Sequence, residues 1–157
     1  MMTKKTQLTH LWCKVGLVVQ LSQMMEYNLA KILALDEILR GFENRDSMFD
    51  FEYRVFVKSA NKWYRKLSRK PLGKSLLRAK SIEFFTEEGE KRLSQAIDKR
   101  NYVVHQLFKD DLQTNHLETD PTFYYEELEN TMDLLQSVNN DLIEIYNKQK
   151  AEYQLIW

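Results

Sequence analysis

The sequence predicts an all-α protein, and more specifically an antiparallel four-helix bundle with a short extra helix. Glycine and proline are scarce in the 157 residues, with 4 and 2 respectively, so few turns interrupt the chain. Long segments repeat apolar residues at alternating steps of four and three, which is the spacing of a packed helix face. A chain of this length buries one core, so we expect residues 1–157 to form a single domain.

The first helix is expected from about Leu8 to Arg40, with Gly41 as a natural stop before the loop "GFENRDSMFD". Trp12 lies in the apolar stripe and is expected in the core, and Cys13, one residue from the buried seam, is expected to be buried and inert. The seam itself consists of Leu11, Val15, Val18, Ser22, Met25, Leu29 and Ile32.

A second helix is expected from about Asp50 to Ser68, with an apolar face that includes Trp63. Tyr64, at the edge of its basic face, is left open between core packing and stacking on a nucleotide base. A turn at Pro71–Gly73 then leads into a short helix that ends near Ile82. The opposite face of the second helix carries six basic residues, Arg54, Lys58, Lys62, Arg65, Lys66 and Arg69.

The third long helix is expected from the N-cap Thr86 to about Leu112, followed by the polar loop "QTNHLETD". Asp120 and Pro121 are expected to be the N-cap and the first position of the last helix. Residues 123–125, which are all aromatic, are expected to pack on the bundle or on a partner subunit. The C-terminal "YQLIW" folds back or contacts another subunit. The last seam is Leu128, Met132, Leu135, Asn139, Leu142 and Tyr146.

The formal net charge is zero, but the charges are segregated along the chain. Ten Lys or Arg and no acid lie between Arg54 and Lys80, and ten Asp or Glu and no base lie between Asp110 and Glu144. Two interpretations remain open: the two segments face each other or the solvent, or the basic segment forms a surface for phosphate groups beside an acidic one.

Several observations bear on location and cofactors. Cys13 is the single cysteine, so no intramolecular disulfide can form, and with no signal peptide we expect a cytoplasmic protein. The apolar segment "VGLVVQLSQMM" is shorter than the roughly 20 residues that span a bilayer, so no membrane association is expected. His10 and His116 sit in distant segments without paired ligands, and we expect neither a metal nor another cofactor.

The segment "AIDKRNYVVHQLF" places polar residues where a helix buries its apolar stripe. Arg100 lies between Ile97 and Val104, while Asn101 and His105, four residues apart, share one flank that the long Arg100 side chain can reach. The apolar side is formed by Leu93, Ala96, Ile97, Val103, Val104, Leu107 and Phe108.

Such a set of side chains suits the cleavage of RNA by its own 2′-hydroxyl. Histidine transfers protons near pH 7, a guanidinium binds a phosphate in a bidentate way, and an asparagine orients either group. The alternative is a structural network in which Arg100 and His105 are satisfied by acids or carbonyls of a neighbouring helix.

"RNYVVHQLF" resembles the Arg–polar–x3–His signature of HEPN domains, and the Leu–Gly turn in "PLGKSLL" is similar to a feature of the same family. The resemblance implies a HEPN-like fold and a metal-independent endoribonuclease in which two copies bring their sites to one cleft. Arg100 would then stabilise the phosphate, Asn101 would be its polar companion and His105 the acid and base. Many bacterial members are toxins or phage-defence effectors. Leu107 stands where members controlled by a nucleotidyltransferase antitoxin often have tyrosine, so that control is not expected.

Two functional hypotheses follow from the sequence. The first is a homodimeric ribonuclease that binds RNA along the basic face and has a protein antitoxin or regulatory partner. The second is a non-catalytic helical-bundle interaction module, an adaptor or inhibitory partner, that binds protein through the acidic last helix or the apolar C-terminus.

Overall fold

The computed structural model describes residues 1–43, 58, 61, 62, 64–66, 69 and 71–155, and the side chains of these except 41–43 and 153–155. Within this part every regular element is helical, which confirms the all-α class. Most of the predicted second helix lies outside the described residues, so the four-helix count is not established. The elements are α1 (Lys4–Glu43), α3 (Leu72–Ala79), α4 (Glu87–His105), α5 (Leu107–Thr114), α6 (His116–Thr119), the 3₁₀ helix η2 (Pro121–Tyr124) and α7 (Tyr125–Leu155).

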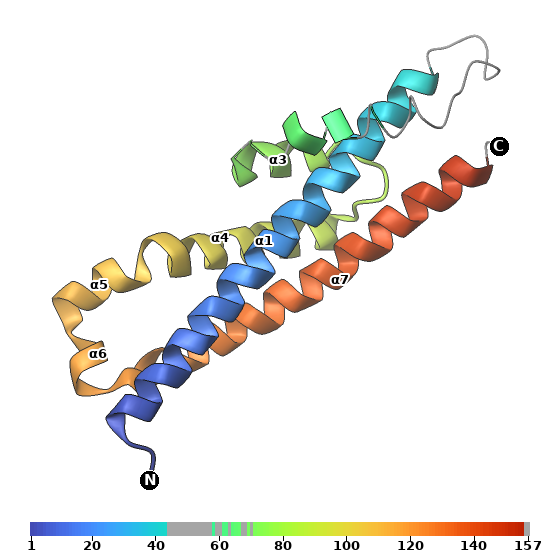
Figure 1. The fold of residues 1–157 in the computed structure, drawn as a ribbon. Coiled ribbons are helices and arrows are strands. Elements are labelled where there is room, and N and C mark those ends of the chain that lie inside the picture. Colours follow the sequence, from blue (N-terminus) through green and yellow to red (C-terminus); the bar gives the residue numbers. More distant parts are fainter. Residues whose placement is uncertain (44–57, 59–60, 63, 67–68, 70, 156–157) are drawn as a thin grey trace.

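The two longest helices, α1 and α7, lie side by side and run in the same direction (Figure 1). Near their starts Lys14 pairs with Glu129 at 2.7 Å, and further along both helices Gln149 donates to the carbonyl of Ile32 at 3.2 Å. Neighbouring helices of an antiparallel bundle would alternate in direction, so that prediction is wrong for this pair.

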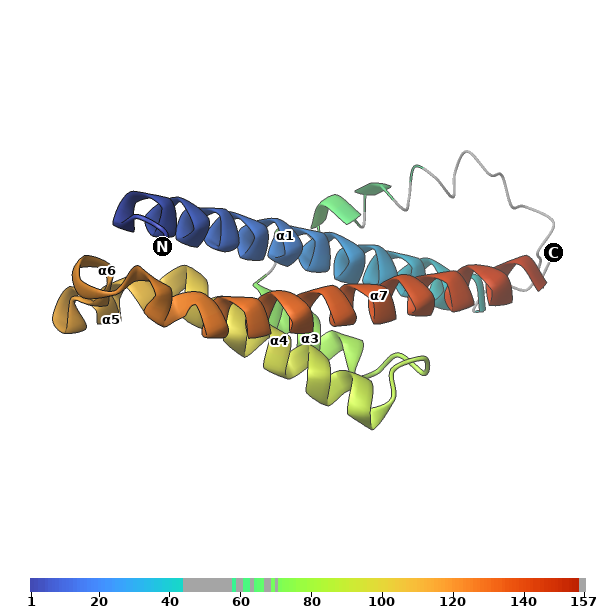
Figure 2. The ribbon, with the colours of Figure 1, turned by 90° about the horizontal axis from the view of Figure 1, so that it is seen from below.

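Helix α4 is antiparallel to α7, as the views in Figures 1 and 2 show. Arg92, early in α4, pairs with Asp141 at 2.5 Å, whereas Lys99, later in α4, pairs with Glu127 at 3.1 Å. The short helices α5 and α6 reverse the chain at the end of the molecule that holds the N-terminus. Because α4 runs opposite to both α1 and α7, this reversal restores in α7 the direction of α1.

The core lies along the contact between α1 and α7, and both predicted seams are confirmed. At Asn139, which is fully buried, a polar layer interrupts the apolar contact between α1 and α7. Its Nδ2 donates to the carbonyl of Leu21 and its Oδ1 accepts from Asn28, both at 3.0 Å. Because a buried amide needs such partners, this layer favours one alignment of the two helices over others.

Helix α3 is fixed against α1 by charge and by packing. Arg78 forms an ion pair with Glu37, and Arg40 donates to the carbonyl of Ser81 at 3.2 Å. The helix begins at Leu72, so the turn predicted at Pro71–Gly73 is wrong for Leu72 and Gly73, and it ends at Ala79, three residues before the predicted end. The turn that follows leads to Thr86, whose side chain accepts the Gly89 backbone N–H at 3.0 Å, so the predicted N-cap of α4 is confirmed.

The predicted helix from Thr86 to Leu112 is broken at Gln106, whose φ of −123° and ψ of −39° lie outside helical values. Residues three apart share a face of a continuous helix, so the break explains why Leu107 is fully buried while Val104, expected on the apolar side, is 41% exposed. The predicted polar loop contains α6, and Asn115 before it has a positive φ of 58°.

The entry into α7 follows the prediction. The Asp120 carboxylate accepts the backbone N–H of Thr122 at 3.1 Å, and Pro121 opens η2, which continues into α7. Tyr124 is buried, and the Tyr125 hydroxyl donates to the carbonyl of Gln7 at 2.6 Å, so these two aromatic residues pack on the bundle.

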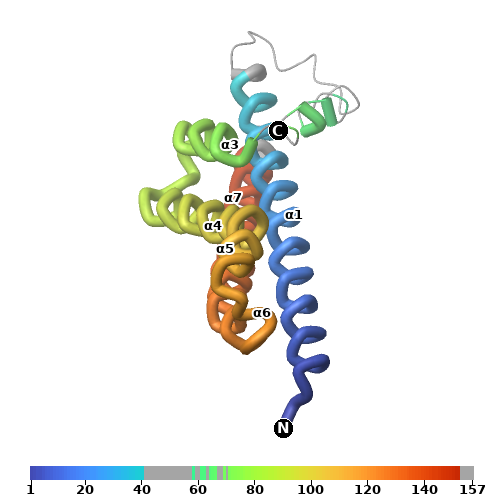
Figure 3. Tube along the Cα trace, turned by 90° about the vertical axis from the view of Figure 1, so that its left-hand side faces the viewer, coloured from blue at the N-terminus to red at the C-terminus, as the bar shows by residue number. Residues whose placement is uncertain are grey.

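Three predictions for the first helix are wrong. It continues beyond Gly41 to Glu43, because a glycine weakens a helix by only about 1 kcal/mol and does not by itself end one. Trp12 is 52% exposed and lies at the edge of the core beside Phe108, with ring centroids 5.3 Å apart, and Cys13 is exposed. Figure 3 shows α1 and α7 from the side, with α4, α5 and α6 next to α7.

None of the described helices combines the length and the apolar character needed to cross a bilayer.

Candidate functional site

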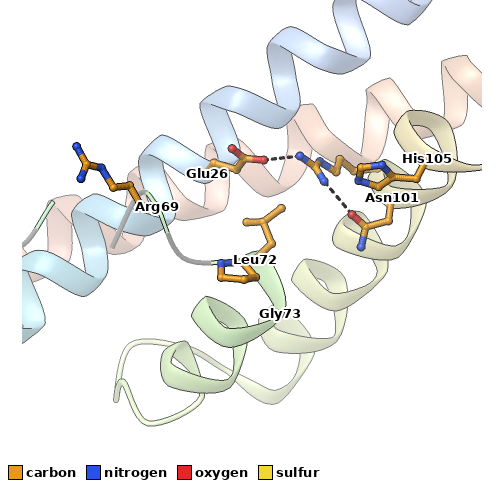
Figure 4. A pocket seen from close by; sticks show the side chains of 8 residues that line it. Glu26, Arg69, Leu72, Gly73, Asn101 and His105 are labelled. Atoms are coloured by element: carbon orange, nitrogen blue, oxygen red, sulfur yellow. Dashed lines mark hydrogen bonds and ion pairs between the residues drawn. The ribbon is translucent and has the colours of Figure 1, made fainter. Parts of the chain in front are cut away.

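A pocket of about 550 Å³ brings together the three predicted catalytic residues (Figure 4). Three parts of the chain contribute to it: the middle of α1, the start of α3 and the last turns of α4. The two segments that resemble HEPN domains, around Gly73 and around Arg100, therefore line the same pocket although 27 positions separate these residues in the sequence. The lining residues are Glu26, Arg69, Pro71, Leu72, Gly73, Arg100, Asn101 and His105.

Arg100 is the best-anchored side chain in the pocket, and it is 20% exposed. Its Nη2 donates to Glu26 Oε1 at 2.7 Å, and its Nη1 donates to Asn101 Oδ1 at 2.9 Å. Its Nε is buried and has no hydrogen-bond partner among the described residues. A buried donor without a partner costs about 1–3 kcal/mol.

Asn101 and His105 stand one helical turn apart on the exposed side of α4, and Figure 4 shows them next to each other. The Asn101 amide holds the guanidinium of Arg100 in place through its oxygen. The His105 ring has no hydrogen-bond partner among the described residues and is open to solvent. Both ring nitrogens are therefore accessible to a molecule in the pocket.

Of the described basic residues that were predicted to bind RNA, one lines this pocket and the others do not. Arg69 lines it, on the side opposite Asn101 and His105 in Figure 4. Four others are exposed but do not line the pocket: Lys58, Lys62, Arg65 and Lys66. Arg54 lies outside the described residues.

Glu26 is the site residue that the sequence interpretation missed. A half-buried arginine needs a negative partner, but 23 acidic residues were available and the sequence did not say which one. One feature of the sequence pointed to Glu26 as the partner: it directly follows the seam residue Met25 and ends an uncharged run that begins after Lys14.

Tyr64, which the sequence left open as a base-stacking residue, does not line this pocket. Tyr64 packs edge-on against Tyr27 of α1, with ring centroids 5.3 Å apart, and burial raises its pKa, with a smaller contribution from Tyr27. Trp63 lies outside the described residues. Among the described residues, no three His, Cys, Asp or Glu side chains lie close enough together to hold a metal ion.

Comparisons with protein-family models, with curated proteins and with solved structures find no match to this chain. The resemblance to HEPN domains therefore rests on the sequence of the two motifs alone.

Proposed function

We propose that this protein is a HEPN-like, metal-independent endoribonuclease that acts as a homodimer, in the role of a toxin or phage-defence effector. The observation that carries the proposal is that Arg100, Asn101 and His105 line one pocket together with Leu72 and Gly73 at the start of α3. Two short motifs read separately from the sequence would have little weight, but their convergence on one open pocket is specific.

In the proposed reaction His105 removes the proton from a ribose 2′-hydroxyl, whose oxygen then attacks the adjacent phosphorus. The bond to the 5′-oxygen breaks, and the leaving oxygen takes a proton from the imidazolium of the second copy's His105. Arg100 stabilises the charge that develops on the phosphate oxygens, and Asn101 keeps its guanidinium oriented. The products are a 2′,3′-cyclic phosphate and a 5′-hydroxyl.

The ion pair with Glu26 determines how substrate reaches the guanidinium. The carboxylate occupies the Nη2 edge of Arg100, which a phosphate would also use for bidentate binding. RNA must therefore displace Glu26 or bind the remaining N–H groups of Arg100. Until RNA binds, the Glu26 carboxylate keeps the guanidinium oriented. Arg69 on the far side of the pocket adds positive charge for an incoming phosphodiester.

An exposed apolar flank of α1 supports the homodimer. The run between Lys14 and Glu26 holds no charged residue, and the flank continues to the pocket at Glu26. A second copy packed there would cover apolar surface of a kind that monomers rarely expose and would lie beside the site. The apolar side chains of this flank are 39–52% exposed: Trp12, Leu17, Val19, Met24 and Tyr27.

The proposal is tested by offering the purified protein, in EDTA, an RNA and its fully 2′-O-methylated copy of the same sequence. Cleavage of the RNA alone, leaving 2′,3′-cyclic phosphate ends, is expected because the methylated copy has no attacking hydroxyl. Cleavage of both strands would contradict the mechanism, and Arg100→Ala should abolish the activity without unfolding the protein.

The second candidate function is a non-catalytic interaction module. The Arg100–Glu26 ion pair favours it, because an arginine with only a structural role would be paired with an acidic residue of a neighbouring helix in this way. In that case Arg100→Ala lowers the melting temperature and no RNA cleavage is found for any variant. The ribonuclease proposal has the stronger support, since a structural pair does not account for the exposed His105 or for Leu72 and Gly73 in the same pocket.

A further inference from the structure

A second pocket, of about 520 Å³, lies between α4, η2 and the first turns of α7. We name it the aromatic–acidic pocket; it is lined by Tyr102, Phe123, Tyr124, Glu126, Glu127 and Asn130. Tyr102 comes two residues after Arg100, which places it about 200° around the helix axis. The aromatic–acidic pocket therefore opens on the other side of α4 from the proposed RNA site.

Phe123 forms an exposed but well-supported wall of this pocket. The side chain is 56% exposed, yet its ring stacks on His116 with centroids 3.6 Å apart and planes 11° apart. It also meets Tyr124 edge-on at 5.2 Å, and Tyr124 is in turn anchored by its hydroxyl to Asp111. An exposed aromatic ring held in one orientation loses little conformational entropy when a partner covers it, which is typical of an interface anchor.

The charge around the pocket is negative. Glu126 has no ion pair among the described residues, and Glu127 is matched by Lys99 at 3.1 Å. The pKa of Tyr102 is raised, first by burial and then by the carboxylates of Asp110 and Glu127, which shows that negative charge acts on the pocket wall. Such a field attracts cations and repels phosphates.

We propose that the aromatic–acidic pocket is a docking site for an arginine side chain presented by a protein partner. A guanidinium is planar and can stack on Phe123 while it donates to the free carboxylate of Glu126, a combination that a lysine ammonium does not offer. RNA is not the expected occupant because the carboxylates repel it. The inference is independent of the ribonuclease proposal, which uses the opposite side of α4.

The test uses the full chain labelled with ¹⁵N and the probe N-acetyl-arginine methylamide. Its neutral, nearly isosteric counterpart N-acetyl-citrulline methylamide is the matched ligand control. We expect amide shifts confined to the surroundings of Tyr102, Phe123 and Asn130, a Kd on the order of millimolar as for a single side chain, and at least roughly fivefold weaker binding of citrulline. Phe123→Ala and Glu126→Gln should each weaken arginine binding by about threefold or more.

Asp133→Asn is the control variant, because it removes one exposed carboxylate from α7 outside the pocket. Its binding should equal that of the wild type. Equal effects of Glu126→Gln and Asp133→Asn, shifts scattered over the acidic surface, or equal binding of citrulline would overturn the proposal. Pocket signals that move with protein concentration alone would also overturn it, since the occupant would then be a second copy of this chain.

Discussion

Replacing Glu26 by glutamine should destabilise the protein more than the same change at Glu129, because the two ion pairs differ in exposure. Both carboxylates lie 2.7 Å from their cations, but the side chains are 34% and 20% exposed in the Glu26–Arg100 pair, whereas Glu129 is 54% exposed in its pair with Lys14. Hydrogen bonds to charged groups contribute about 1.5–3 kcal/mol when partly buried, against about 0–1 kcal/mol for exposed ion pairs.

Glutamine keeps the shape and one acceptor, so we expect Glu26→Gln to cost about 1.5 kcal/mol. For a chain of this size that lowers the melting temperature by about 3–6 °C, and Glu129→Gln should stay within about 2 °C of the wild type. Thermal unfolding followed by circular dichroism measures both. Glu26→Gln should also bind inorganic phosphate more tightly, because the negative charge beside the Arg100 guanidinium is removed. Equal melting temperatures for the two variants, with unchanged phosphate binding, would refute this account of Arg100.

Three further outcomes are expected. Asn139→Ala should cost about 2–3 kcal/mol in urea unfolding, because the Asn28 amide loses a buried partner. The pKa of Tyr124 is raised to about 12, by burial and by its hydrogen bond to Asp111, so the folded state keeps this proton above pH 10 while the unfolded state loses it. Stability should therefore fall by about 2 kcal/mol between pH 10 and 12, and this part of the loss should disappear in Tyr124→Phe. Met24→Glu on the exposed flank of α1 should shift the protein from dimer to monomer in analytical ultracentrifugation, whereas dimerisation equal to that of the wild type would remove this surface from the proposal.

The sequence predicted the helices and their buried seams well, because apolar spacing and capping are local properties. The seam of α7 and the caps at Thr86 and Asp120 needed only neighbouring residues to be recognised. The break at Gln106 was missed because no glycine or proline marks it. The parallel direction of α1 and α7 depends on where the chain turns between α3 and α6, which local periodicity does not determine.

The candidate site was predicted in part. Arg100, Asn101 and His105 lie on one helix, so helical geometry alone brought them near one another. Glu26 and Arg69 reach the same pocket from elsewhere in the chain, and such long-range pairing is not encoded in spacing. Trp12 and Cys13 were placed in the core because hydrophobicity indicates burial without indicating which flank of a helix is covered.

The most direct test of the central claim is the initial rate of RNA cleavage in EDTA by wild type, His105→Ala and His10→Ala. His10 is an exposed histidine near the start of α1 and does not line the pocket, so it controls for the loss of an imidazole. The account predicts that His105→Ala loses at least roughly a hundredfold in rate, as expected for a general acid–base, while His10→Ala cleaves like the wild type. Equal cleavage by wild type and His105→Ala would contradict the assignment of this pocket as an active site.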